Sequence, residues 1–393
     1  MIRSFAVAML ATLAGASTLS VCAQSASATG VQYPKLTLQN SGTKNGLIAV
    51  SPVNDRVVWA SGRNGTYVIT TDGGQHWKAG VVPGAEALQF RDVQGISAKE
   101  AYLLSIGNGP DARIYKTEDG GDHWTRQFES QDPNAFYDCF AFWTPQRGIA
   151  TSDSVYGRFP AIRTLNGESW MDIGDHLPKA AKGEASFAAS GTCVATQGLQ
   201  NAWIVTGGSL YAHVLATRDG GNTWNRYYVP TVQGTPASGI FSVAFRDPWH
   251  GIEGAGDLDH PKVPQKNIAR SCDGGKTWKL SQGTPFVGAV YGLAYASSQP
   301  LLSAADENSA SENSATANSS GGQPSSYCSG DHESPGIGRT VVATGPGGAA
   351  YTSDEGATWH LLYGAYNYWA VAFASPQSGW FVGTGGRILK IGF

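Results

Sequence analysis

The chain has 393 residues, of which 51 are glycine, 41% are hydrophobic and only 15% are charged. This composition favours an all-β protein with many turns, and the length is sufficient for a large core. The formal net charge is −3. Because no basic stripe or block of like charges occurs along the chain, we expect no nucleic-acid partner.

Residues 1–28 have the pattern of a cleaved secretory signal peptide. Arg3 supplies a positive charge, residues 5–21 are mostly apolar or small, and cleavage near residue 23 or 28 fits the sequence. An alternative interpretation makes Cys22 a lipidated cysteine. No later segment contains the roughly 18 uninterrupted apolar residues that a membrane span needs. We therefore expect a periplasmic or secreted protein without a membrane span.

A short motif of the form Thr/Ser-x-Asp-Gly-Gly-x-x-Trp occurs six times, with its acidic positions 47, 47, 53, 54 and 81 residues apart, a repeat typical of a β-propeller. Asp can bond to backbone amides downstream of it, and Gly adopts the positive φ of a tight turn. We expect each Trp to begin a strand as a buried anchor, and the shorter third copy to form the loosest turn. The motif residues are Asp72 and Trp77, Asp119 and Trp124, Asn166 and Trp170, Asp219 and Trp224, Asp273 and Trp278, and Asp354 and Trp359.

Residues 31–393 can be divided into seven blades of four short antiparallel strands, because β-branched and aromatic runs alternate with Gly- and Pro-rich turns. The seventh blade ends at Phe393 after its third strand. The missing strand is predicted at KLTLQNS, near residues 35–41, which would pair with the last blade and close the ring. Closure would leave no long exposed sheet edge.

Residues 297–338 form a Ser/Asn/Gly-rich insert in blade six, and we expect a flexible loop there. Four cysteines follow the signal peptide, and an exported protein can contain two disulfides. We predict a Cys272–Cys328 bond that tethers the insert. Cys139 and Cys193 occupy matching positions in blades three and four, where either a disulfide or a reduced buried pair fits.

The motif and blade pattern resembles that of the BNR/Asp-box propellers. Within this group the chain is most similar to bacterial relatives of the photosystem II stability/assembly factor, through segments such as VAFASPQSGWFVGTGGRILK and IFSVAFRDPWHG. The resemblance covers the whole mature chain. It implies a seven-bladed, exported, non-catalytic protein that binds partners or helps membrane complexes to assemble. Sialidases and xyloglucanases share the same motif.

No catalytic motif is evident: the chain has no nucleophile elbow, no His-Glu-x-x-His, no phosphate loop and no identifiable pair of catalytic carboxylates. We expect neither a cofactor nor a metal. The loops opposite the motif turns are chemically richer, and propellers often bind ligands there. Candidate ligand-binding residues on these loops are Asp257, Asp259, His260, Arg158, Tyr156, Tyr137, Asp138, Tyr366 and Trp369.

These observations favour a protein-binding or assembly scaffold with an envelope or extracellular protein as its partner. We expect the protein to be a monomer. Two alternatives remain: a glycoside hydrolase or sialidase-like enzyme, suggested only by the shared fold motif, and a glycan-binding module in which Trp369 and Tyr366 stack on a sugar.

Overall fold

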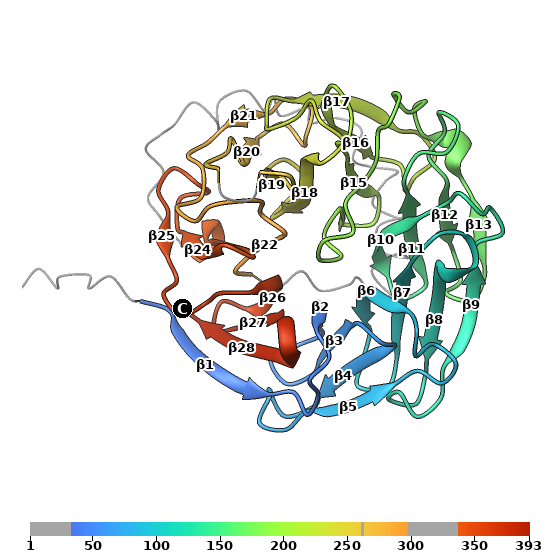
Figure 1. The fold of residues 1–393 in the computed structure, drawn as a ribbon, viewed down its shortest axis with the longest axis vertical. Coiled ribbons are helices and arrows are strands. Elements are labelled where there is room, and N and C mark those ends of the chain that lie inside the picture. The colour runs from blue at the N-terminus through green and yellow to red at the C-terminus, as the bar shows by residue number, and fades with distance from the viewer. Residues whose placement is uncertain (1–32, 261–262, 298–336) are drawn as a thin grey trace, which may run out of the picture. The chain divides into compact units, whose positions relative to one another are not determined.

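Seven four-stranded antiparallel sheets are arranged as blades around one axis in residues 34–393 (Figure 1). The structure is a computed structural model that describes residues 33–260, 263–297 and 337–393. This architecture confirms the predicted seven-bladed propeller. Helical elements within these ranges include four 3-10 turns, η1 (Gly109–Asp111), η2 (Gly174–His176), η4 (Ile337–Arg339) and η5 (Thr384–Gly386).

Each blade starts at the axis and proceeds outward through hairpins. The innermost strands are β2 (Leu47–Pro52), β6 (Gln89–Gly95), β10 (Tyr137–Thr144), β14 (Val194–Gln197), β18 (Ser238–Phe245), β22 (Gly292–Tyr295) and β26 (Tyr368–Ser375). The second strands are β3 (Val58–Gly62), β7 (Ala101–Ile106), β11 (Arg147–Ser152), β15 (Asn201–Val205), β19 (Gly251–Asp257), β23 (Val341–Gly345) and β27 (Ser378–Gly383).

The third strands are β4 (Thr66–Thr70), β8 (Arg113–Thr117), β12 (Ala161–Thr164), β16 (Ala212–Thr217), β20 (Ile268–Ser271), β24 (Gly348–Thr352) and β28 (Arg387–Gly392). The outer strands are β5 (Lys78–Val81), β9 (Thr125–Glu129), β13 (Trp170–Asp172), β17 (Asn225–Val229), β21 (Lys279–Leu280), β25 (His360–Leu361) and β1 (Lys35–Asn40). The blades therefore have two kinds of end. We name the "motif face" after the turns between third and outer strands, and the "loop face" after the turns between second and third strands.

The ring closes between the two ends of the folded unit. Strand β1 pairs antiparallel with β28, from Lys35 opposite Gly392 to Asn40 opposite Arg387, as the outer strand of the last blade (Figure 1). The side chain of Gln39 then reaches blade one, where it accepts a hydrogen bond from Trp77 Nε1 at 3.1 Å. The predicted closure by the N-terminal strand is confirmed.

The turn after β16 shows how the repeated motif closes a hairpin. Thr217 Oγ1 accepts the backbone N–H of Gly221 at 3.0 Å and donates to Asp219 Oδ1 at 2.8 Å. Asp219 Oδ1 accepts the backbone N–H of Thr223 at 2.9 Å, and Asp219 Oδ2 accepts the hydroxyl of Thr223 at 2.7 Å. The third copy, predicted to be the loosest, makes similar bonds, with Asn166 Oδ1 2.9 and 3.0 Å from two backbone nitrogens.

Each motif turn also accepts a hydrogen bond from the preceding blade through a glycine carbonyl. The donors and acceptors are Gln39 and Lys390 to Gly73, Tyr67 to Gly121, Tyr102 to Gly167, Arg163 to Gly220, Trp203 and Arg218 to Gly274, and Ser281 to Gly356. The motif therefore joins neighbouring blades as well as closing its own hairpin.

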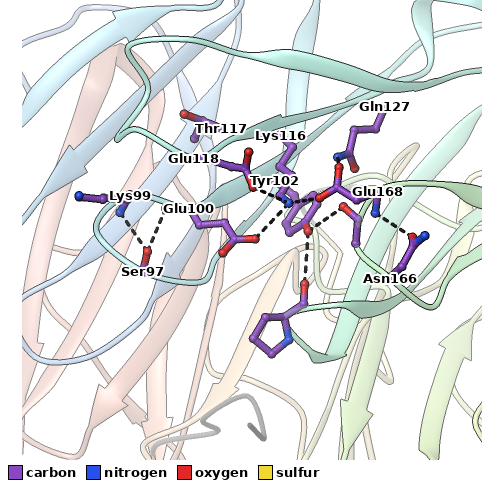
Figure 2. Close-up of polar contacts among 12 residues, drawn as sticks. Ser97, Lys99, Glu100, Tyr102, Lys116, Thr117, Glu118, Gln127, Asn166 and Glu168 are labelled. Atoms are coloured by element: carbon purple, nitrogen blue, oxygen red, sulfur yellow. Dashed lines mark hydrogen bonds and ion pairs between the residues drawn. The ribbon is translucent and has the colours of Figure 1, made fainter. Parts of the chain in front are cut away.

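Figure 2 shows the junction between blades two and three. The amine of Lys116 is 3.4 Å from a carboxylate oxygen of Glu100 and 3.0 Å from one of Glu118, and it contacts Glu168 of the next motif turn. The ring of Tyr102 lies 5.7 Å from the same amine. Because the Lys116 side chain is only 7% exposed, its charge is compensated within the protein, and it holds the two blades together.

The burial of the motif tryptophans differs from the prediction. Trp224 and Trp278 are buried, but the other four motif tryptophans are half-buried. Four other tryptophans, from inner and second strands, are buried completely: Trp59, Trp143, Trp203 and Trp380. The motif position lies at the start of the outer strand, so blade-to-blade packing covers its side chain only in part.

A disulfide joins Cys139 of β10 to Cys193, just before β14, and both residues are fully buried. Strand β14 has only 4 residues and begins directly after Cys193. Cys272 is also disulfide-bonded, whereas its predicted partner Cys328, most of the insert and the predicted signal peptide lie outside the described residues. In the described part of the chain, no helix is both long and apolar enough to cross a membrane.

Candidate binding site at the mouth of the central channel

Five innermost strands contain one extra residue near their start, at the loop face. The pairing register with the second strand skips Ile48, Arg91, Asp138, Phe241 and Trp369. A β-bulge leaves its extra residue outside the ladder and turns its side chain to a new direction. Each blade concerned thus presents one side chain, out of register, near the axis of the ring.

Aromatic side chains from four successive blades contact one another at this position. The ring centroids of Trp369 and Tyr291 are 5.0 Å apart, those of Tyr291 and Phe241 are 5.7 Å apart, and those of Phe241 and Phe187 are 4.3 Å apart. Phe241 is buried, whereas the other three are half-buried. The resulting aromatic arc extends from blade seven to blade four.

Arg91 of blade two completes this arc. Its guanidinium carbon lies 5.4 Å from the ring centroid of Trp369, and its Nη1 donates to the carbonyl of Ala188 in blade four at 2.8 Å. Nη2 donates to Gln89 at 3.3 Å, while Nε is buried and makes no hydrogen bond within the described residues. The half-buried Arg91 therefore brings a positive charge to the axis, and one of its N–H groups is buried without a hydrogen-bond partner.

The carboxyl group of Asp138 lies within electrostatic reach of Arg91 and is bonded to a second carboxyl group, that of Asp153. Asp138 is 1% exposed, and its side chain is hydrogen-bonded to that of Asp153, which also accepts the backbone N–H of Ser186 at 3.0 Å. Burial, followed by the charge of Asp153, raises the pKa of Asp138 well above its usual range. Burial also raises the pKa of Asp153 to about 6. Asp153 is therefore ionised at neutral pH, and within the pair Asp138 gives up its proton less readily than Asp153.

We name these residues the channel mouth: Arg91, Asp138, Asp153, Phe187, Phe241, Tyr291 and Trp369. Nearer the motif face, a cavity of about 240 Å³ is lined by innermost strands of all seven blades. Asp92 lines this cavity, but its two oxygens accept the backbone N–H groups of Val93 and Phe140, each at 2.8 Å. The carboxylate of Asp92 is thus used in holding strands together, and the mouth is the chemically richer end.

Among the residues predicted from sequence, Trp369 and Asp138 come together, since both lie beside Arg91. Tyr366 lies two residues before β26, the strand that contains Trp369, and is 50% exposed. Tyr137 is buried and packs edge-on against Phe128 of blade two, so it belongs to the interface between blades.

The other predicted residues form two separate local clusters. In blade five, Asp257 accepts the backbone N–H of Asp259 at 2.9 Å and lies 3.0 Å from His260 Nδ1, which closes a self-contained turn. In blade three, the exposed Tyr156 bonds to Asn134, and Arg158 forms ion pairs with Asp172 and Asp175 at 2.6 and 2.8 Å. The described residues contain no group of three or more His, Cys, Asp or Glu side chains that could hold a metal ion.

Five residues of the channel mouth were not predicted from the sequence: Arg91, Asp153, Phe187, Phe241 and Tyr291. A signal was present, because Arg91, Asp138, Phe241, Tyr291 and Trp369 occupy the same position in the segments FRDV, YDCF, IFSV, VYGL and YWAV. Charged residues at Arg91 and Asp138 interrupt apolar strands that should be buried, which marks them as functional candidates.

Fold and site together define a seven-bladed β-propeller with a polar and aromatic surface at one end of its channel. No protein-family model matches the sequence, and a comparison with curated proteins finds no match. Several solved structures have the same fold. YCF48 from Cyanidioschyzon merolae is 15% identical, with 91% of this chain and 98% of that chain covered and a TM-score of 0.57.

A structure described as YCF48 bound to D1 peptide is 16% identical, with 92% and 97% of the two chains covered and a TM-score of 0.54. The GH74 enzyme of Niastella koreensis is 11% identical, and the match covers 90% of this chain but 53% of the enzyme, with a TM-score of 0.53. At these identities the similarity demonstrates the propeller fold.

Proposed function

We propose that this protein is an exported, non-catalytic scaffold that binds a protein partner, in the manner of an assembly or stability factor. The main support is the channel mouth, where half-buried aromatic rings and an arginine from different blades form one surface. Aromatic and arginine side chains are the residues that dominate binding energy at protein interfaces. A solved propeller of the same fold carries a peptide, according to its description.

Export to the periplasm or the cell exterior is part of this proposal. It is supported by the signal-like sequence of residues 1–28 and by the disulfide between Cys139 and Cys193. Disulfides form and persist in oxidising compartments and are rare in the cytosol.

Hydrolysis of a glycoside fits the geometry less well. Glycosidases hold two carboxyl groups about 5–10 Å apart, so that a sugar and a water molecule fit between them. The carboxyl groups of Asp138 and Asp153 instead bond to each other, which leaves no such space. The glycan-binding alternative depends on exposed aromatic rings, and Trp369 is already covered in part by Arg91 and Tyr291.

Site-specific photo-crosslinking in cells that produce the protein would test the proposal. A photoreactive amino acid would replace Tyr291 at the channel mouth and, as the control, Tyr228 on outer strand β17, which is 51% exposed. We expect one protein to be crosslinked from position 291, and this product to disappear in the Trp369→Ala variant. Equal crosslinking from both positions, or glycan-array binding without any protein crosslink, would refute the proposal.

A further inference from the structure

Three arginines from successive blades lie on the loop face without a carboxylate partner. Arg63 follows β3 in blade one, Arg91 is the bulged residue of blade two, and Arg387 begins β28 in blade seven. No ion pair joins any of the three to a carboxylate of the described residues, whereas Arg113, Arg158 and several other arginines are paired.

Two of these arginines, Arg63 and Arg91, act on each other electrostatically. Burial and then the positive charge of Arg63 lower the pKa of Arg91, and Asp138 opposes that effect. Tyr291 also lies within electrostatic reach of Arg91, and burial raises the pKa of its phenol, so it stays neutral. The carboxyl group that acts on Arg91 is that of Asp138, which is bonded to Asp153; the nearby carboxyl of Asp92 is engaged with the backbone N–H groups of Val93 and Phe140.

We propose that the channel mouth binds an acidic segment of its protein partner, and that acidification strengthens this binding because the Asp138–Asp153 pair loses its negative charge. The inference rests on the proposed protein-binding function and adds the chemistry of the partner and its regulation. The anion would approach Arg91, whose side chain is half-buried and forms no ion pair with a carboxylate of the described residues.

The direction of the effect follows from the charge balance at the mouth. At neutral pH Asp153 is ionised, and the carboxyl pair, through Asp138, offsets part of the positive charge of Arg91. Because burial raises the pKa of Asp153 to about 6, mild acid protonates this carboxylate while the aspartates of a flexible peptide, with a pKa of about 3.9, stay ionised. The mouth then has an uncompensated arginine facing an anionic ligand.

The test measures binding of an end-blocked tetra-aspartate peptide to the folded protein by titration calorimetry at about pH 5 and about pH 7.5, on either side of the Asp153 transition. A tetra-asparagine peptide serves as the uncharged probe. We expect about fivefold tighter binding of the acidic peptide at the lower pH, the effect of one unit charge at close range in water. The asparagine peptide should show no such change.

Single-residue variants separate the role of Asp153 in the pH dependence from the role of Arg91 in binding the acidic peptide. Asp153→Asn should bind at the higher pH as tightly as the unmodified protein does at the lower pH, and Arg91→Gln should lose binding at both. Arg218→Gln is the matched control, because Arg218 lies 5.5 Å from the Trp249 ring on the motif face, much as Arg91 lies over Trp369. This control should bind like the unmodified protein.

The outcomes distinguish this inference from the proposed function. Equal affinity at both pH values would refute the regulation, and so would a carbon-13 NMR titration in which no aspartate of the unmodified protein titrates near pH 6. If the acidic peptide fails to bind at either pH while the crosslink from position 291 persists, the acidic-partner inference is wrong and the protein-binding proposal stands.

Discussion

Replacement of Trp203 by alanine should strongly destabilise the propeller, because this side chain joins blades four and five in two ways. Its ring is fully buried and stacks on that of Phe245 with centroids 3.5 Å apart. Its Nε1 donates to the carbonyl of Gly274, in the motif turn of blade five, at 2.8 Å. The neighbouring Gly275 has a φ of +86°, and a Cβ there would lie 2.9 Å from Trp203 Nε1, so the indole fits closely against this turn.

The expected loss in the free energy of unfolding has two parts, one from packing and one from hydrogen bonding. Removal of a buried tryptophan leaves a cavity and costs about 3–5 kcal/mol. Trp203→Phe keeps an aromatic ring and loses the donor, at a cost of about 1 kcal/mol. Gly274 retains a partner in that variant, because Arg218 Nη2 donates to the same carbonyl at 3.0 Å.

Guanidinium unfolding monitored by circular dichroism would measure both variants. Trp249→Ala is the control, since Trp249 is 44% exposed on the motif face, and its loss should cost at most about 1 kcal/mol. A cost below about 1 kcal/mol for Trp203→Ala, or equal costs for the alanine and phenylalanine variants, would show that the packing between blades four and five does not limit stability.

The closure strand and the titrating carboxyl groups lead to three further predictions. Deletion of residues through Asn40 removes the pairing of β1 with β28 and should lower the free energy of unfolding by roughly 3–6 kcal/mol, at about 1 kcal/mol for each backbone bond; an unchanged denaturation midpoint would contradict ring closure by β1. Asp138→Asn should raise stability at neutral pH by about 1 kcal/mol or more, because it removes an acid whose ionised form burial disfavours. In the native state of the unmodified protein the pKa of Asp153 is about 6, whereas its ordinary value is 3.8. Because the folded protein binds this proton more tightly than the unfolded chain does, Asp153 makes the free energy of unfolding fall as the pH rises from 3.8 to about 6. Asp119 acts in the opposite direction: the backbone N–H of His123 lowers its pKa to about 2, and its contribution is lost as pH falls from 3.8 towards that value. Thermal melting between pH 3 and pH 8 would show a maximum near pH 4–5, and a profile that rises monotonically to neutral pH would exclude the proposed role of the carboxyl pair.

Local sequence patterns were enough to predict the seven blades, the motif turns and the closure by β1. These features depend on local chemistry: alternating apolar residues form short strands, and the Thr217–Asp219–Gly221 type of turn is closed by side chains within a few residues of one another. The position of KLTLQNS as the missing strand followed from counting strands. Strands and turns can be predicted from such local signals without knowing which blades are neighbours in the ring.

The residues that meet at the axis could be identified only in the folded ring. Arg91 and Trp369 belong to blades that are far apart in sequence, and ring closure, together with a bulge in each inner strand, brings them to 5.4 Å. The raised pKa of Asp138 likewise depends on burial, which only the folded ring supplies. Burial likewise selected Trp203 over most motif tryptophans as a core residue, because packing between blades, and not the motif itself, determines which rings lose contact with water.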